Sequence, residues 1–180
     1  MSSSTILDVS DVTLRFGGVT ALEEVSFSVQ PGELFAIIGP NGAGKTSIFN
    51  CINGVYKPEK GSISFEDKEL IGKRPVNVAR LGVGRTFQNL GLFMNLNLID
   101  NLLLGRHLQM KTGFLSGALW WGRAKNEEIV NRQKIEIIID LLELQPYRYQ
   151  AVGLLPYGIQ KRVELGRALA MEPRILLLDE

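Results

Sequence analysis

The sequence predicts an α/β fold with a mixed, mostly parallel core sheet, an N-terminal antiparallel β subdomain and a helical subdomain. Three observations support this prediction: two alternating segments near the N-terminus, one continuous apolar run after them, and one long helical pattern in the second half. With 180 residues, 45% of them hydrophobic and 22% charged, the chain can bury the core of about one domain.

The first strands are predicted from alternation of apolar and polar residues. VTLRF (12–16) and VSFSV (25–29) both show the pattern, which is typical of half-buried antiparallel strands. The intervening GGVTALEE (17–24) is predicted as the turn. In contrast, ELFAIIG (33–39) is continuously apolar after Pro31-Gly32, and this predicts a strand covered on both faces in a parallel sheet.

The helical subdomain is expected between about residues 90 and 160. From Asn126 the chain places Ile135, Ile138, Ile139 and Leu142 at helical spacing, with acidic residues in the predicted first turn. We therefore expect one domain over 1–180, with the core sheet in about 1–89, the helical part in about 90–160, and a return to the core in about 161–180.

Charge and cysteine content limit the possible partners and compartments. The 20 basic and 19 acidic residues give a net charge of +1, so nucleic acid is not expected as a partner. Cys51, the only cysteine, excludes an internal disulfide and is predicted to pack in the core. The sequence shows neither a secretory leader pattern nor an apolar run of 18 residues. A cytoplasmic location is therefore expected, with membrane contact through a partner.

GPNGAGKT (39–46) matches the pattern G-x-x-x-x-G-K-[ST] between an apolar run and a predicted helix. Glycines let backbone N–H groups converge on phosphate oxygens, and the helix start adds its positive end. Lys45 is expected to contact the terminal phosphates, Thr46 to bind Mg²⁺, and Ser47 to reach an inner phosphate. The alternative is a glycine-rich turn that binds nothing. The predicted cradle consists of Gly39, Pro40, Asn41, Gly42, Ala43, Gly44, Lys45, Thr46 and Ser47.

RILLLDE (174–180) is an apolar strand pattern that ends in two acids. Asp179 is predicted to hold Mg²⁺ through water, and Glu180 to act as the base that polarises the attacking water. Taken alone, this pattern also fits a structural strand with an acidic end. Just upstream, a helix with Val163, Gly166 and Ala170 on one face is predicted before Pro173.

The order of GPNGAGKT, RTFQN (85–89), LPYGIQKRVELGRALA (155–170) and ILLLDE resembles the nucleotide-binding subunit of ABC transporters, over essentially the whole chain. LRFGGVTALEEVSF, GVGRTFQN and DNLLLGRH are most similar to ATPases of importers for branched-chain amino acids, or for urea and other amides. The resemblance implies a P-loop NTPase fold, ATP and Mg²⁺ as cofactors, and attachment to the inner face of the cell membrane. The implied partners are a second ABC ATPase subunit, membrane permease subunits and, indirectly, a solute-binding protein.

The same resemblance implies residue roles. Phe16 would stack on adenine, although an aromatic closing a strand is otherwise ordinary core. Gln88 would link the Mg²⁺ site to the permease. A signature segment would contact ATP of the opposing subunit in a head-to-tail dimer; it consists of Leu155, Pro156, Tyr157, Gly158, Ile159 and Gln160.

The signature segment departs from the family pattern L-S-G-G-Q at Pro156, Tyr157 and Ile159. Proline supplies neither a hydroxyl nor an N–H, so one expected phosphate contact is lost. We expect Gly158 and the helix end to carry the contact instead.

Other features leave alternatives open. The family continues after Glu180 with a D-loop and a switch histidine, a role that His107 cannot fill, so we expect a fragment that hydrolyses ATP poorly. The insert GFLSGALWWGRAKNEE, with Trp120 and Trp121, is either a contact surface or a loop folded on its own domain. The alternative functions are a permease-free ABC ATPase acting on nucleic acid or ribosomes, and a nucleotide-binding fragment without turnover.

Overall fold

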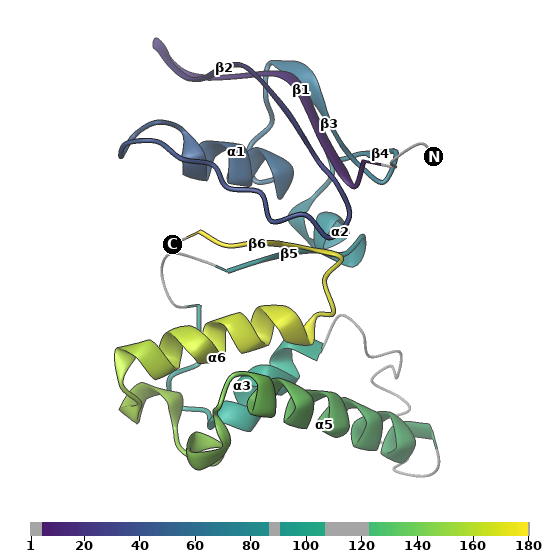
Figure 1. Ribbon diagram of the computed structural model, residues 1–180, viewed down its shortest axis with the longest axis vertical. Helices are drawn as coiled ribbons and strands as arrows, with labels where there is room; N and C mark the ends of the chain where they lie inside the picture. The colour runs from purple at the N-terminus through teal and green to yellow at the C-terminus, as the bar shows by residue number, and fades with distance from the viewer. Residues whose placement is uncertain (1–4, 87–90, 107–122, 180) are drawn as a thin grey trace. The chain divides into compact units, whose positions relative to one another are not determined.

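The computed structural model of the chain describes residues 5–86, 91–106 and 123–179, with side chains from residue 129 onward in the last range. The chain forms two compact units, residues 1–83 and 84–180 (Figure 1). Each unit is described by itself below, as unit 1 and unit 2.

Unit 1 is built on a four-stranded antiparallel sheet in the order β2-β1-β3-β4. Its strands are β1 (Leu7–Phe16), β2 (Val19–Val29), β3 (Lys60–Phe65) and β4 (Lys68–Glu69). The two alternating segments are thus confirmed as antiparallel neighbours. The predicted turn over 17–24 is wrong, because Phe16 pairs with Val19 and only Gly17 and Gly18 connect the strands.

A β-bulge partway along β1 changes which side chains point to the buried face of the sheet. Val9 pairs with Phe27 and Val12 with Val25, so β1 has one extra residue between these pairs. Asp11 takes it up in a left-handed conformation, with φ 50°, and its N–H donates to Ser26 Oγ at 2.8 Å. Val9 and Val12 are consequently both buried, although strict alternation would place them on opposite faces.

The predicted buried strand over residues 33–39 is wrong. None of the described strands pairs with this segment, and Leu34 and Ile38 are 96% and 93% exposed. A strand needs backbone partners along its edges, and apolar composition alone does not supply them. One side chain does pack, because the ring of Phe35 stacks on Phe27 of β2 with centroids 5.0 Å apart.

Two short helices complete unit 1: α1 (Lys45–Ile52) and α2 (Pro75–Arg80). Figure 1 shows α1 along one face of the sheet. Its buried residues are Ile48, Cys51 and Ile52. Cys51 is 1% exposed, which confirms its packing role, and burial raises the pKa of its thiol to about 11.

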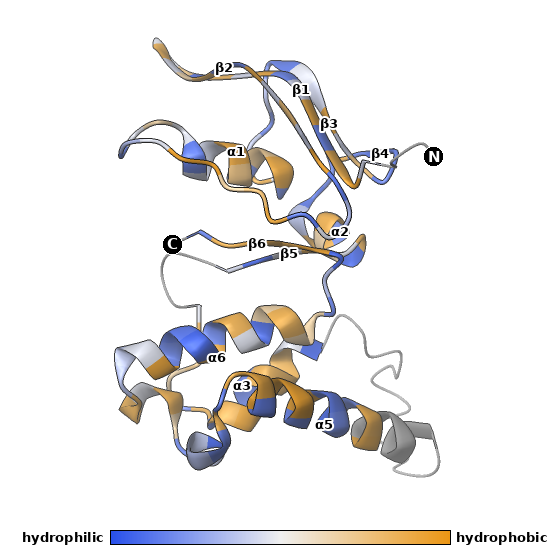
Figure 2. Cartoon of the chain, viewed as in Figure 1, coloured by the Kyte–Doolittle hydropathy of each residue, from blue (hydrophilic) through white to orange (hydrophobic). Residues whose placement is uncertain are grey.

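Unit 2 combines a helical part with a two-stranded parallel sheet of β5 (Val83–Arg85) and β6 (Ile175–Leu177). The helices are α3 (Leu98–Gly105), α5 (Arg123–Leu141) and α6 (Tyr157–Ala170), with the 3₁₀ turns η2 (Gln145–Tyr147) and η3 (Val152–Leu154). Figure 2 shows that β6 is hydrophobic along its length, as predicted. Together the two units confirm the α/β class.

The predicted spacing on α5 and α6 is confirmed by burial. Ile135 and Ile139 of α5 pack in one core with Val163 and Ala170 of α6. The prediction of acidic residues in the first turn of α5 is wrong, because the helix begins at Arg123, before Asn126.

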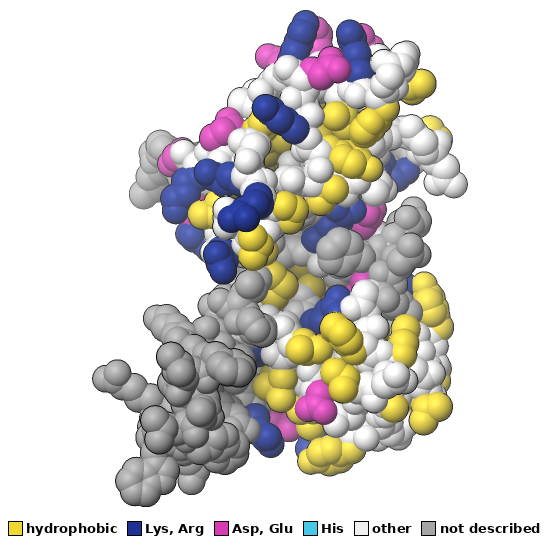
Figure 3. Space-filling view, turned by 180° about the vertical axis from the view of Figure 1, so that it is seen from behind, with side chains coloured by type: hydrophobic (Ala, Val, Ile, Leu, Met, Phe, Trp, Pro, Cys, Tyr) yellow, Lys and Arg dark blue, Asp and Glu magenta, His cyan; other side chains and the backbone are white. Residues whose placement is uncertain are grey.

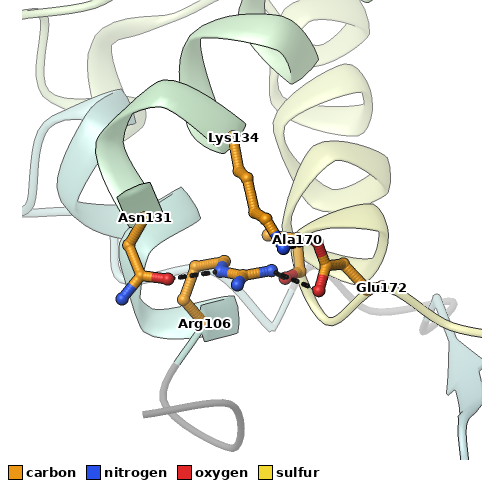
Figure 4. A network of polar contacts seen from close by, with 5 residues as sticks. All are labelled: Arg106, Asn131, Lys134, Ala170 and Glu172. Atoms are coloured by element: carbon orange, nitrogen blue, oxygen red, sulfur yellow. Dashed lines mark hydrogen bonds and ion pairs between the residues drawn. The ribbon is translucent and has the colours of Figure 1, made fainter. Parts of the chain in front are cut away.

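A polar network closes the C-terminal end of α6 (Figure 4). The buried Arg106 donates to Ala170 O at 3.0 Å and to Asn131 Oδ1 at 3.0 Å. Its guanidinium also lies 3.2 Å from Glu172, which Lys134 contacts as well. The network thus ties α3, α5 and the end of α6 together, and it caps the last carbonyl of α6 with a cation.

Candidate nucleotide-binding site

The phosphate-binding loop of unit 1 leads directly into α1. Gly42 and Gly44 adopt left-handed conformations, with φ 84° and 87°, and Gly44 is the N-cap residue of the helix. No side chain caps this helix start, and its first turn contains no acidic residue. No acidic residue of the first turn therefore offsets the positive end of α1, which favours an anion there.

Gly44 is required by packing as well as by backbone conformation. A Cβ at this position would lie 2.6 Å from Ala21 O and 2.9 Å from Leu22 Cδ2, both on β2. The loop consequently sits directly against the sheet. Gly42 differs, since a Cβ there would meet nothing within 4 Å.

Lys45 folds its side chain back over the loop. Its ammonium donates to Gly39 O at 2.6 Å and to Pro40 O at 2.9 Å. Pro40, Asn41, Gly42, Ala43 and Thr46 are exposed around it. The arrangement places a cation, glycine N–H groups and a helix start at one surface, which is the chemistry that recognises a phosphate chain.

Phe16 lies at the hairpin end of the same sheet. Its side chain is 48% exposed and meets the Tyr56 ring edge-on, with centroids 5.1 Å apart. It is therefore not ordinary core, and its exposed ring is a surface on which a base can stack.

The signature segment in unit 2 surrounds the start of α6. Pro156 is the N-cap residue, no side chain caps the helix, and Tyr157 and Gly158 are exposed. Leu155 is buried and Ile159 packs against the helical core, so these two side chains support the segment. Gln160 does the same, because its amide donates to Val152 O at 3.2 Å and to Leu155 O at 2.9 Å.

Asp179 lies two residues beyond β6, at the edge where β5 also ends. Its side chain is 8% exposed, and its Oδ2 accepts from Arg85 Nη2 at 2.7 Å. Its N–H donates to Thr86 Oγ1 at 3.4 Å. The carboxyl ends of neighbouring parallel strands meet at one edge, where ligands of α/β proteins commonly bind.

Sequence reasoning missed two sets of contacts at these sites: the ion pair of Arg85 with Asp179, and the hydrogen bonds from Gln160, a predicted signature residue, to two backbone carbonyls near η3. Arg85 and Asp179 are 94 positions apart in the sequence, and the Gln160 contacts depend on the local course of the backbone. No sequence pattern therefore indicates either. Gln88, Glu180, His107, Trp120 and Trp121 lie outside the described residues. Gly39 and Ser47 are half-buried at the two ends of the phosphate loop.

The surface and the helices add two observations. In the view of Figure 3, hydrophobic side chains lie exposed on both units; Leu34 of unit 1 and Leu154 and Tyr157 of unit 2 are among the most exposed large ones. Within the described part of the chain, no helix has both the length and the apolar character to cross a membrane.

Curated relatives match nearly the whole chain. The high-affinity branched-chain amino acid transport ATP-binding protein LivG of Escherichia coli K12 is 39% identical over 99% of this chain and 70% of its own length. BraF of Pseudomonas aeruginosa, which has the same description, is 40% identical with the same coverage. A spermidine/putrescine import ATP-binding protein, PotA of Mycoplasma capricolum, is 34% identical over 98% of this chain and 45% of its length.

Solved structures give the same result for the fold. A nucleotide-free ATP-binding cassette from an ABC transporter has a TM-score of 0.78 at 32% identity, covering 98% of this chain and 69% of the other. An ADP conformation of such a cassette has a TM-score of 0.77 at 30% identity, covering 96% and 67%. The family profile described as ABC transporter matches residues 22–180. The chain therefore belongs to the ABC transporter family, as an ATP-binding transport ATPase with the α/β fold of that family.

Proposed function

We propose that this chain comes from the ATP-binding and ATP-hydrolysing subunit of an importer for branched-chain or other amino acids. The observation that carries the proposal is the phosphate loop, where Lys45 and an uncapped helix start present positive charge beside Gly42 and Gly44. The solute class is supported by the LivG and BraF relatives, which match more closely and over more of their length than the polyamine importer protein.

The proposed residue roles follow the chemistry of the two sites. Phe16 stacks on adenine, the loop from Gly39 to Ser47 holds the phosphates, and Thr46 and Asp179 bind Mg²⁺. A hydroxyl oxygen and a carboxylate oxygen each suit the metal, since Mg²⁺ commonly uses one or two protein oxygens together with phosphate oxygens and water. Gln88 and Glu180 keep their predicted roles as the link to the permease and the base.

The proposed assembly has two ABC ATPase subunits arranged head to tail on a membrane permease, at the inner face of the cell membrane. In it, the start of α6 in one subunit faces the nucleotide of the other, and a solute-binding protein delivers the solute. Units 1 and 2 are parts of a single nucleotide-binding domain.

A binding measurement tests the phosphate loop. Lys45→Ala should weaken ATP binding on the order of 10- to 100-fold, because a charge-assisted contact to phosphate is lost. Isothermal calorimetry with a slowly hydrolysed ATP analogue measures the change, and Lys57→Ala, an exposed lysine of the same unit, is the control. Equal affinity of Lys45→Ala and the unaltered chain would refute the assigned site.

A transport measurement tests the solute. In vesicles that contain the ATPase with its permease and binding protein, leucine uptake should require ATP and stop in Lys45→Ala. Uptake of spermidine without uptake of leucine would overturn the proposed solute class and leave the ATPase assignment in place.

A further inference from the structure

Asp179, whose carboxylate we assign to Mg²⁺ binding, forms an ion pair with Arg85. Arg85 is the last residue of β5, and its Nη2 lies 2.7 Å from Asp179 Oδ2. The side chains are 7% and 8% exposed, so water solvates neither charge well. Backbone contacts hold the two strand ends in register, because Thr86 N–H donates to Leu177 O at 3.0 Å. The pair is therefore built into this edge of the sheet.

We infer that Arg85 is an internal counter-ion of Asp179, which holds the carboxylate in place without metal and competes with Mg²⁺ for it. This inference rests on the proposed function, in which Asp179 binds the metal. A buried carboxylate needs a partner, and the guanidinium supplies charge and hydrogen bonds in a fixed geometry.

The same positive charge opposes an approaching cation. Like charges within several ångströms repel appreciably where water screens them poorly, and both side chains here are almost fully buried. A carboxylate has about four acceptor positions, so a contact with Arg85 and a contact with a metal-bound water are chemically compatible. Arg85 therefore sets how much Mg²⁺ is required, while Asp179 supplies the contact.

A Mg²⁺ titration of nucleotide binding tests this inference. At a fixed concentration of a fluorescent ATP analogue, the Mg²⁺ concentration at half-maximal binding should fall about tenfold in Arg85→Gln, which keeps a donor but loses the charge. Arg85→Lys is the matched control, because it keeps the charge; its midpoint should stay within about threefold of the unaltered chain. An unchanged or raised midpoint in a folded Arg85→Gln variant would overturn the inference.

A metal-free measurement covers the case in which Arg85→Gln does not fold. Asp179→Asn leaves the buried guanidinium without its carboxylate, so thermal unfolding in chelator should occur at a lower temperature than in the unaltered chain. Adding Arg85→Gln to Asp179→Asn should restore part of that loss. A double variant no more stable than Asp179→Asn would overturn the counter-ion role.

The outcomes separate the inference from the proposed function. Asp179→Asn should lose most of the Mg²⁺ dependence of ATP binding. If it does while Arg85→Gln leaves the midpoint unchanged, only the inference fails. If the unaltered chain binds the analogue without any dependence on Mg²⁺, the metal role of Asp179 fails and the inference fails with it.

Discussion

The starts of α1 and α6 have the same electrostatic character but reach it by different means. Both helices begin without a side-chain cap and without acids in the first turn. At α1 the backbone conformation positions the helix start, because left-handed Gly44 lets the loop lie close against β2. At α6 a side chain positions the helix start, because the Gln160 amide donates to the carbonyls of Val152 and Leu155.

This difference shows which part of each site can vary in sequence. A loop shaped by glycine conformation tolerates few substitutions at the glycines, since other residues are strained at positive φ. Gln160 holds the segment before α6 through backbone carbonyls, so the exposed side chains of that segment can be substituted. The departures at Pro156 and Tyr157, both exposed, are therefore compatible with an intact helix start.

The largest expected effect is that of Gly44→Ala. Strain at φ 87° and the approach to Ala21 O should together cost about 3 kcal/mol or more, with loss of nucleotide binding. Gly42→Ala has similar φ but open space around it, so about 1–2 kcal/mol is expected. Urea unfolding midpoints measure both. Equal losses for the two variants would remove the packing role assigned to Gly44.

The clamp at α6 is tested by Gln160→Leu. Removal of two hydrogen bonds to loop carbonyls should cost about 1–3 kcal/mol, measured by urea unfolding. Gln150→Leu is the control, because the side-chain amide of exposed Gln150 donates, among the described residues, only to Pro146 O, at 3.3 Å; its cost should be below about 0.5 kcal/mol. If both variants unfold at the same denaturant concentration, the segment before α6 is held by something other than Gln160.

Gly158→Ala separates stability from function at the start of α6. A Cβ there would meet nothing within 4 Å, and alanine favours helix, so stability should be unchanged or higher by about 0.5–1 kcal/mol. ATP-dependent self-association, measured by sedimentation, should weaken, because a methyl group would lie between the helix end and the phosphate. Undiminished association would show that Gly158 does not face nucleotide.

The smallest effect concerns the C-terminal end of α6. Charged side chains interact there, whereas the start of the helix has no side-chain cap. The hydrogen bond from Lys134, followed by contacts with Arg106, lowers the pKa of the Glu172 carboxyl below its usual 4.5. A lowered pKa gives stability that is present above about pH 4.5 and lost as pH falls through the folded-state value. The carboxylate is partly exposed, so Glu172→Gln should cost less than about 1 kcal/mol at pH 7.

Urea unfolding at pH 7 and pH 3 measures this contribution. The difference between the unaltered chain and Glu172→Gln should shrink at pH 3, whereas Glu23→Gln, at an exposed position on β2, serves as the control. A difference that is the same at both pH values would exclude a carboxylate contribution from Glu172.

Sequence reasoning found the elements whose periodicity is strong. The alternation in β1 and β2, the helical spacing on α5 and α6, and the apolar β6 all reflect local burial. It failed for residues 33–39, because strand formation depends on partners elsewhere, and for the bulge at Asp11, which a single register shift creates. The motifs located the phosphate loop and Asp179, but the Arg85–Asp179 pair joins residues 94 positions apart and depends on strand pairing.

The proposed head-to-tail dimer is tested most directly by a mixing experiment with two inactive variants. Lys45→Ala removes the phosphate contact, and Gly158→Glu places a carboxylate at the start of α6, where open space avoids a clash. In a head-to-tail dimer, one intact site forms from the loop of the Gly158→Glu chain and the α6 start of the Lys45→Ala chain. The head-to-tail arrangement predicts that sedimentation with ATP shows dimers for the unaltered chain and for the mixture, but not for either variant alone. ATP-dependent dimers of the unaltered chain, with none in the mixture or with equal amounts in each variant alone, would contradict it.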